Sequence, residues 1–305
     1  MRIGYRSLLI VPFLAVLITS CSSSSSTSQK PFLPTGKLVI TPQFDAAYDF
    51  VDGLALVQIG KQFGYIDKTG KYLIQPQFDD AFDFADGLAR AQSGGKFGYI
   101  DKTGKYLIQP QFDDAKNFAD GLAVVQSGGK FGYIDKTGKY LIQPKFDNAY
   151  KFADGLAIVQ SGGKFGYIDK TGKYLIQPKF DDTNDFVDGL ALVQIGKQFG
   201  YIDKTGKYLI QPQFDNAYDF VDGLALAQIG GKFGYIDKTG KYLIQPKFDN
   251  ANDFVDGLAR AQSGKKWGYI DKTGKYLIQP RFDSVNDFAD GLALVQSGKK
   301  WGYIS

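Results

Sequence analysis

A 34-residue period constrains this chain more than any other feature of its sequence. The stretch from Gly64 to Pro76 recurs with few changes at that spacing. Later copies begin at Gly98, Gly132, Gly166, Gly200, Gly234 and Gly268, and a truncated copy begins at Gly302. A fixed period of this length is typical of an array of small structural units. The fold is therefore decided by one unit and by how the units are joined.

The recurring stretch predicts a β-hairpin. Aromatic and β-branched residues alternate with others over residues 63–67 and 71–75, which is the pattern of two half-buried strands. The intervening Asp67-Lys68-Thr69-Gly70 suits a type I turn, with Gly70 as the left-handed residue of the following bulge. Pro76 is predicted to end the second strand, because it has no N–H to donate to the ladder.

The rest of each unit adds at least one more strand. Asp86-Gly87 predicts a turn, residues 88–92 a short strand, and residues 93–96 a second hairpin turn. Residues 77–85 fit either a fourth strand or turns. No helical period is present, and eight regularly placed prolines, Pro42 to Pro280, argue against long helices. We expect an all-β fold of antiparallel β-repeat units.

The two ends of the array suggest how the units are arranged. Residues 37–42 match a second hairpin strand without its first, and residues 300–304 match a first strand without its second. Eight units are counted at one repeat position: Asp45, Asp79, Asp113, Asp147, Asp181, Asp215, Asp249 and Asp283. We therefore expect a propeller-like closed ring, sealed by pairing of the terminal strands, in preference to an open β-superhelix or solenoid. Units of 34 residues are short beside propeller blades of about 40 or more, which argues for the open form.

Two repeat positions vary between units. The position of Phe82 also holds Tyr48, Lys116, Tyr150, Asn184, Tyr218, Asn252 and Asn286, so it is predicted to lie on the surface. The position of Arg90 accepts both aliphatic residues and arginine, which predicts a half-exposed site.

The N-terminal segment has the features of an export signal. Residues 1–20 combine two arginines with a short apolar run. Leu17-Ile18-Thr19-Ser20-Cys21 resembles the lipobox of bacterial lipoproteins, which implies lipidation of Cys21 and attachment to a bacterial membrane. The resemblance to this family also implies that the residue after the cysteine, here Ser22 and not aspartate, permits sorting to an outer membrane where the organism has one. The alternative is a conventional cleaved signal with an incidental cysteine.

The predicted domain organisation follows from these segments. Residues 1–20 are the lipoprotein signal peptide, residues 21–36 a Ser-rich flexible tether, and residues 37–305 the β-repeat domain.

The motif that gives the repeats their family likeness is clearest near the C-terminus. Trp267-Gly268-Tyr269-Ile270-Asp271 and Trp301-Gly302-Tyr303-Ile304 resemble the WG repeats of bacterial proteins, and the neighbouring residues 282–283 and 288–292 agree. Six units carry Phe-Gly instead, as at Phe63-Gly64. The resemblance covers the whole array and implies a β-rich repeat domain, often on exported or envelope proteins, without a known enzymatic activity.

The composition argues against catalysis. The chain has no histidine, its 32 acidic residues are all aspartate, and Cys21 is its single cysteine. No general base, triad or zinc site can be built from histidine or cysteine. Paired carboxylates such as Asp79 and Asp80 recur in most units and fit turns better than a unique glycosidase pair. Asp83 and Asp86 offer oxygen ligands for calcium without EF-hand spacing, so we predict no metal and no cofactor.

Two binding functions remain. The formal net charge of +4 is too small to predict nucleic-acid binding. The preferred function is a non-enzymatic, lipid-anchored envelope protein whose array is a scaffold or binding module for an envelope protein. The alternative is binding of a cell-surface glycan or peptidoglycan, with Tyr48, Tyr150 and Tyr218 as candidate ligand-binding residues.

Overall fold

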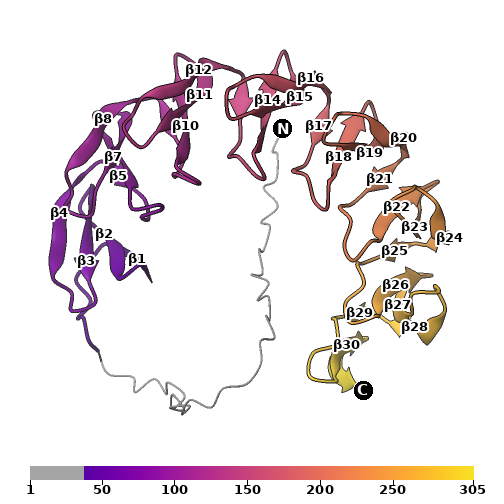
Figure 1. The fold of residues 1–305 in the computed structure, drawn as a ribbon. Coiled ribbons are helices and arrows are strands. Elements are labelled where there is room, and N and C mark those ends of the chain that lie inside the picture. The colour runs from indigo at the N-terminus through magenta and orange to yellow at the C-terminus, as the bar shows by residue number, and fades with distance from the viewer. Residues whose placement is uncertain (1–37) are drawn as a thin grey trace, which may run out of the picture. The chain divides into compact units, whose positions relative to one another are not determined.

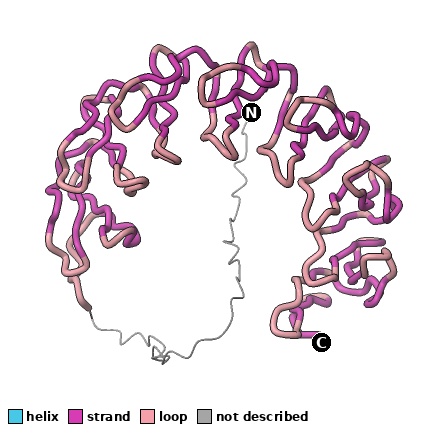
Figure 2. Tube along the Cα trace, viewed as in Figure 1, coloured by secondary structure: helices cyan, strands magenta, loops and turns pink. Residues whose placement is uncertain are grey.

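Short alternating segments separated by turns build an all-β structure, as the sequence predicts. A computed structural model describes residues 38–305; the predicted signal peptide, Cys21 and the tether at 21–36 lie outside the described residues. Strands and loops account for all of residues 38–305 (Figure 2). Accordingly, this part of the chain has no helix long and apolar enough to cross a membrane.

The strands form seven four-stranded sheets and one three-stranded sheet, each an antiparallel meander from one repeat (Figure 1). The first strands of the units are β1 (Ala46–Val51), β5 (Asp80–Ala81), β9 (Asp114–Ala115), β13 (Asn148–Ala149), β17 (Asp182–Thr183), β21 (Asn216–Ala217), β25 (Asn250–Ala251) and β29 (Ser284–Val285). The second strands are β2 (Leu54–Ile59), β6 (Ala89–Ser93), β10 (Leu122–Ser127), β14 (Leu156–Ser161), β18 (Leu190–Ile195), β22 (Ala225–Ile229), β26 (Ala259–Ser263) and β30 (Ala293–Ser297).

The remaining strands complete each sheet. The third strands are β3 (Gln62–Asp67), β7 (Lys96–Ile100), β11 (Lys130–Asp135), β15 (Lys164–Asp169), β19 (Gln198–Asp203), β23 (Lys232–Ile236), β27 (Lys266–Ile270) and β31 (Lys300–Ile304). The fourth strands are β4 (Tyr72–Phe78), β8 (Tyr106–Phe112), β12 (Tyr140–Phe146), β16 (Tyr174–Phe180), β20 (Tyr208–Phe214), β24 (Tyr242–Phe248) and β28 (Tyr276–Phe282). The first strand of most units is the segment that the sequence left undecided, and it is only two residues long.

The predicted turns are confirmed. Between β10 and β11, Ser127 pairs with Lys130 across a two-residue loop. Between β3 and β4, the Gly70 N–H donates to the Asp67 carbonyl at 2.9 Å, and Gly70 has a φ of 87°. The Asp67 carboxylate accepts the Thr69 N–H at 2.8 Å and the Lys71 N–H at 3.1 Å. This carboxylate therefore holds the turn closed.

The glycine of the WG motif allows the third and fourth strands to approach each other. A Cβ added at Gly132 would lie 2.5 Å from the Ile142 carbonyl oxygen and 2.7 Å from the Pro144 nitrogen. The pairing of β11 with β12 is irregular at this point, as expected for a bulge. The prediction that the proline ends its strand is wrong: β12 runs through Pro144 to Phe146, because the missing N–H falls in the irregular part of the ladder.

The hydrophobic core is divided among the junctions between successive sheets. At one junction, Tyr99 and Phe112 of the second sheet (β5–β8) pack with Ala123 and Val125 of the third sheet (β9–β12). Ala123 packs against the preceding sheet. The alanine at this repeat position is buried in all eight units. Each unit therefore depends on its neighbours to cover its apolar faces, as in other repeat proteins.

The position of Arg90 is more buried than predicted. Its aliphatic equivalents Leu56, Val124 and Ile158 are buried at junctions between sheets. Arg90 itself is half-buried, and its guanidinium donates to the Ala115 carbonyl of the next sheet while lying 3.5 Å from the Phe82 ring centroid. The half-exposed interpretation holds for arginine and for Leu294 of the last unit, and it is wrong for the other aliphatic residues.

The prediction of a closed propeller ring is wrong for this structure. Residues 38–45, which match a fourth strand in sequence, form no strand, and Leu38 and Val39 are exposed. In the eighth sheet, β31 pairs with β30 alone. Matching terminal sequences are necessary for closure but do not decide it, because the rotation between sheets is set by side-chain packing at every junction. The described strands thus form eight separate sheets without a closing pair.

Candidate functional site

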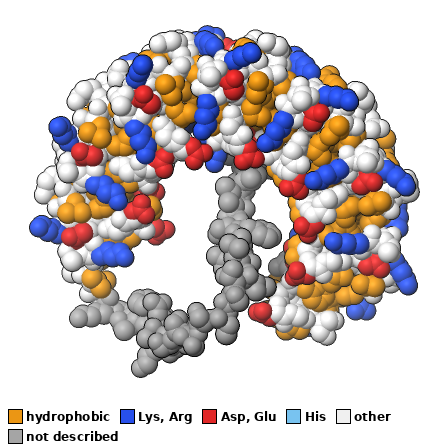
Figure 3. Space-filling model, viewed as in Figure 1, with side chains coloured by type: hydrophobic (Ala, Val, Ile, Leu, Met, Phe, Trp, Pro, Cys, Tyr) orange, Lys and Arg blue, Asp and Glu red, His pale blue; other side chains and the backbone are white. Residues whose placement is uncertain are grey.

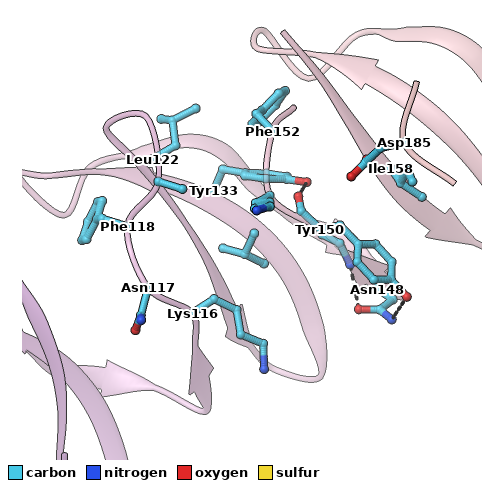
Figure 4. Close-up of a pocket in the computed structure, with 14 residues that line it drawn as sticks. Lys116, Asn117, Phe118, Leu122, Tyr133, Asn148, Tyr150, Phe152, Ile158 and Asp185 are labelled. Atoms are coloured by element: carbon cyan, nitrogen blue, oxygen red, sulfur yellow. Dashed lines mark hydrogen bonds between the residues drawn. The ribbon is translucent and has the colours of Figure 1, made fainter. Parts of the chain in front are cut away.

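A pocket lies at the junction between the third sheet (β9–β12) and the fourth sheet (β13–β16) (Figure 4). Its volume is about 680 Å³, which is within the range of small-molecule sites. Residues before β10 and on β11 form one wall, and residues on and after β13 form the other. The pocket therefore opens along the loops that follow the short first strands, where the repeats differ most.

Aromatic rings form the inner walls of this pocket. The Tyr133 and Phe152 ring centroids are 5.0 Å apart, and both side chains are buried. The Tyr133 hydroxyl donates to the Tyr150 backbone carbonyl at 2.8 Å, which ties the third sheet to the fourth. Burial raises the pKa of Tyr133, so the hydroxyl remains a neutral donor. These contacts give the pocket a rigid apolar floor.

Tyr150, one of the three tyrosines predicted to bind ligand, lines the pocket with its exposed side chain. Its ring centroid lies 6.5 Å from that of Phe165, and its hydroxyl accepts a hydrogen bond from the Asn148 amide at 3.3 Å. Both neighbours restrict the ring, so Tyr150 presents a fixed aromatic surface at the edge of the pocket.

Charged and amide side chains surround the opening. Lys116 and Asn117 come from the third unit, Lys151 from the fourth and Asp185 from the fifth. The Lys116 ammonium is 2.7 Å from an Asp114 carboxylate oxygen. Burial raises the pKa of the Asp185 carboxyl, and the positive charge of Lys151 opposes that shift. The opening can therefore offer both cationic donors and a carboxylate acceptor to a ligand.

The other two predicted tyrosines lie in different units. Tyr48 is on β1 and Tyr218 follows β21, and both are exposed. Tyr218 has the same neighbours as Tyr150: its ring is 6.5 Å from that of Phe233, and its hydroxyl accepts from Asn216 at 3.3 Å. The three tyrosines occupy equivalent repeat positions and do not converge on one site.

A second surface feature repeats along the fourth strands. One leucine per unit is 48–58% exposed there, although the residues on either side of it are more buried. We call these residues the leucine row: Leu73, Leu107, Leu141, Leu175, Leu209, Leu243 and Leu277. Hydrophobic side chains lie on the surface of successive units, with lysine and aspartate side chains between them (Figure 3).

Two further predictions concern a metal ion and a lipid. Within residues 38–305 there is no group of three or more His, Cys, Asp or Glu side chains placed to hold a metal ion. Cys21 lies outside the described residues, so its lipidation stays a prediction.

Sequence reasoning missed the two lysines beside Tyr150. The available signal was a local change of charge at the position after the variable one. That position is aspartate in six units: Asp49, Asp83, Asp185, Asp219, Asp253 and Asp287. It is Asn117 in the third unit and Lys151 in the fourth, and both of these residues line the pocket.

One protein-family model matches nearly all of the described repeats. The family model described as WG containing repeat matches residues 34–62, 63–97, 97–131, 131–165, 165–198, 199–233, 233–267 and 267–301. No curated protein matches the sequence.

Solved structures share only a distant likeness. A crystal structure of a eukaryotic initiation factor is 13% identical, with a TM-score of 0.43 over 77% of this chain and 76% of that chain. Kluyveromyces lactis Hsv2p is 9% identical, with a TM-score of 0.38 over 71% and 88% of the two chains. The extracellular domain of the putative hybrid two component system BT4673 from B. thetaiotaomicron is 11% identical, with a TM-score of 0.34 over 79% and 41%.

Proposed function

The chain belongs to the WG-repeat family, and on that premise we propose that it is a non-enzymatic binding module of the bacterial envelope. In this proposal, lipid on Cys21 holds the protein at the membrane, and the repeats form a scaffold that binds an envelope protein. A repeat array suits this role because one interaction surface is presented many times.

The observation that carries the protein-binding proposal is the exposure of the leucine row. A single exposed leucine is common on protein surfaces and needs no explanation. Seven leucines at one repeat position, each about half exposed, instead give a partner the same apolar contact in successive units.

Crosslinking in cells tests the protein-binding proposal. Full-length protein in which Leu141, Leu175 and Leu209 are changed to serine should lose its crosslinked envelope partner. The matched control changes Gln143, Gln177 and Gln211 to serine, which are two residues further along the same strands and are also exposed. Equal crosslinking by the leucine and glutamine variants would contradict a role for the leucine row.

Membrane attachment is tested separately. Cys21→Ser should move the protein from the detergent phase to the aqueous phase in a phase-partition assay, since the predicted lipid would be lost. Unchanged partitioning would show that Cys21 is not the anchor, and it would leave the binding proposal standing.

A second candidate function is binding of a cell-surface glycan. It is favoured by one specific observation, the pocket beside Tyr150. Retention of the full-length protein on purified wall polysaccharide, reduced by Tyr150→Ala, would support this function over protein binding.

A further inference from the structure

The pocket beside Tyr150 differs from the rest of the array in the sign of its charge. Six units carry aspartate at the repeat position of Lys151, and the fourth unit carries lysine. At the position before it, the third unit carries Lys116 where every other unit has an aromatic residue or asparagine. Both exceptions line the same pocket. At these two repeat positions, lysine therefore occurs only in the two units on either side of this pocket.

The two lysines differ in their availability to a ligand. Lys116 is held by Asp114 at 2.7 Å, so part of its charge is already compensated. Lys151 is exposed and forms no ion pair with any residue in 38–305, although its charge acts on the Asp185 carboxyl. An anionic group entering the pocket would gain a charge-assisted hydrogen bond from Lys151 without displacing an existing partner.

The walls restrict what can carry that anionic group. A pocket volume of about 680 Å³ is large enough for a small molecule that contains one or two rings. The Tyr133 and Phe152 side chains give it an apolar floor, and Tyr150 provides a flat ring at the edge. The Asn117 amide can donate and accept, and the Asp185 carboxylate can accept from a hydroxyl. The Asn148 amide already donates to the Tyr150 hydroxyl and accepts from the Ala149 N–H, so it can offer a ligand only its second N–H and its second lone pair. A ring with an apolar face, several hydroxyls and one negative charge satisfies all of these groups.

We propose that the pocket between the third and fourth sheets binds an acidic saccharide, with its carboxylate at Lys151 and its ring against Tyr150. The proposal rests on the second proposed function, glycan binding, and specifies the class of sugar. Two sources share this chemistry: the uronic acids of surface polysaccharides, and cell-wall muramic acid whose lactyl carboxyl carries no stem peptide.

The test uses two pairs of sugars, each with an acid and a neutral counterpart that has the same type of ring. N-acetylmuramate is compared with N-acetylglucosamine, and glucuronate with glucose, by calorimetric or NMR titration of the full-length protein in detergent micelles. At least one acid should bind tenfold or more tightly than its neutral counterpart, and the pair concerned identifies the source. Added salt should weaken that binding.

The decisive variant is Lys151→Asp, which introduces the residue that six other units carry and is therefore expected to fold. It should weaken binding of the acid by tenfold or more and leave the melting temperature unchanged. Tyr150→Ala should weaken binding of the acid, while Tyr218→Ala should not, although Tyr218 has matching ring and amide neighbours.

Three results would overturn the inference: no binding of either acid at millimolar concentration, equal binding of acid and neutral sugar, or wild-type binding by Lys151→Asp. Equal binding of acid and neutral sugar that still depends on Tyr150 would keep glycan binding and reject only the acidic class. Absence of binding to all four sugars and to wall polysaccharide would reject both glycan binding and the preference for an acidic sugar.

Discussion

Two junctions of the array share one scaffold and differ at their loops. Between the third and fourth sheets, Tyr133 donates to the Tyr150 carbonyl at 2.8 Å; between the fifth sheet (β17–β20) and the sixth sheet (β21–β24), Tyr201 donates to the Tyr218 carbonyl at 2.6 Å. The ring pairs beneath them, Tyr133–Phe152 and Tyr201–Phe220, have centroids 5.0 and 4.8 Å apart. The buried contacts are thus nearly interchangeable.

The loops at these two junctions carry opposite charges. The first has Lys116 and Lys151, whereas the second has Asn184 and Asp219, with the Asn184 amide 3.2 Å from the Asp219 carboxylate. The scaffold therefore tolerates lysine, asparagine or aspartate at these positions without a change in its buried contacts. Packing of buried side chains therefore sets how successive sheets are arranged. The loops after the first strands can vary in charge and can determine what is bound.

The largest expected effect tests whether the scaffold is the same at both junctions. Gly132→Ala and Gly200→Ala would place a Cβ 2.5 and 2.6 Å from a backbone carbonyl oxygen of the adjacent strand. Each should destabilise the protein by about 3 kcal/mol, because backbone must move to relieve the overlap. Denaturant unfolding measures the loss.

Gly302→Ala is the control for these two variants, because no heavy atom lies within 4 Å of the added Cβ. It should change stability little. A clear difference between Gly132→Ala and Gly200→Ala would break the claim of an interchangeable scaffold.

A smaller effect is expected from the buried tyrosine hydroxyls. Tyr133→Phe and Tyr201→Phe each leave one carbonyl of the next unit without its donor, which should cost about 1–2 kcal/mol. The two losses should agree within experimental error in thermal or denaturant unfolding. A loss of stability in only one of the two variants would show that the tyrosines have different roles.

The loop at the second junction should make protein stability depend on pH through Asp219. Burial raises the pKa of Asp219, so its charged form is disfavoured in the folded state and the resulting destabilisation is present at neutral pH. Asp219→Asn should therefore stabilise the protein at pH 7, by less than about 1 kcal/mol because the group is partly solvated. The gain should shrink as pH falls through the folded-state pKa and vanish below about pH 4, where the carboxyl is protonated in both states. A gain that grows toward low pH would contradict this sign.

The smallest expected effect concerns a charge pair that joins the same sheets. Lys130, on β11, pairs with Asp147 before β13 and lowers the pKa of that carboxyl. The stabilisation is present above the ordinary aspartate pKa and is lost as pH falls through the lower folded-state pKa. Lys130→Met should reduce the melting temperature slightly at low salt and not at high salt. Gln198→Met, at the equivalent uncharged position of the fifth sheet, should show no such salt dependence.

Local features of the fold could be predicted from the sequence because each has a local cause. Asp67 and Gly70 specify their turn through one carboxylate and one positive φ, and alternation specifies the strands. Closure of the ring could not be predicted, because the angle between sheets is set by packing that single residues do not report. Pro144 was misjudged for a related reason: its effect depends on the partner strand, where Gly132 allows an irregular pairing.

The candidate site could be predicted only in part. Tyr150 was identified from the variability of its position, and the structure places it on a pocket. Tyr48 and Tyr218 were grouped with it because sequence gives no distances between units. The sequence did not reveal that Lys116 and Lys151 line the same pocket, because they belong to different units and come together only when the units pack.

Transplanting the loop charges tests most directly the claim that loops determine what is bound. Asn184→Lys and Asp219→Lys together would give the sixth sheet's junction the lysines found beside Tyr150. The measurement is equilibrium dialysis of the full-length protein with whichever labelled acid, N-acetylmuramate or glucuronate, binds the wild type. We predict that the number of sites per chain rises from one to two. An unchanged number of sites in a folded variant would contradict it.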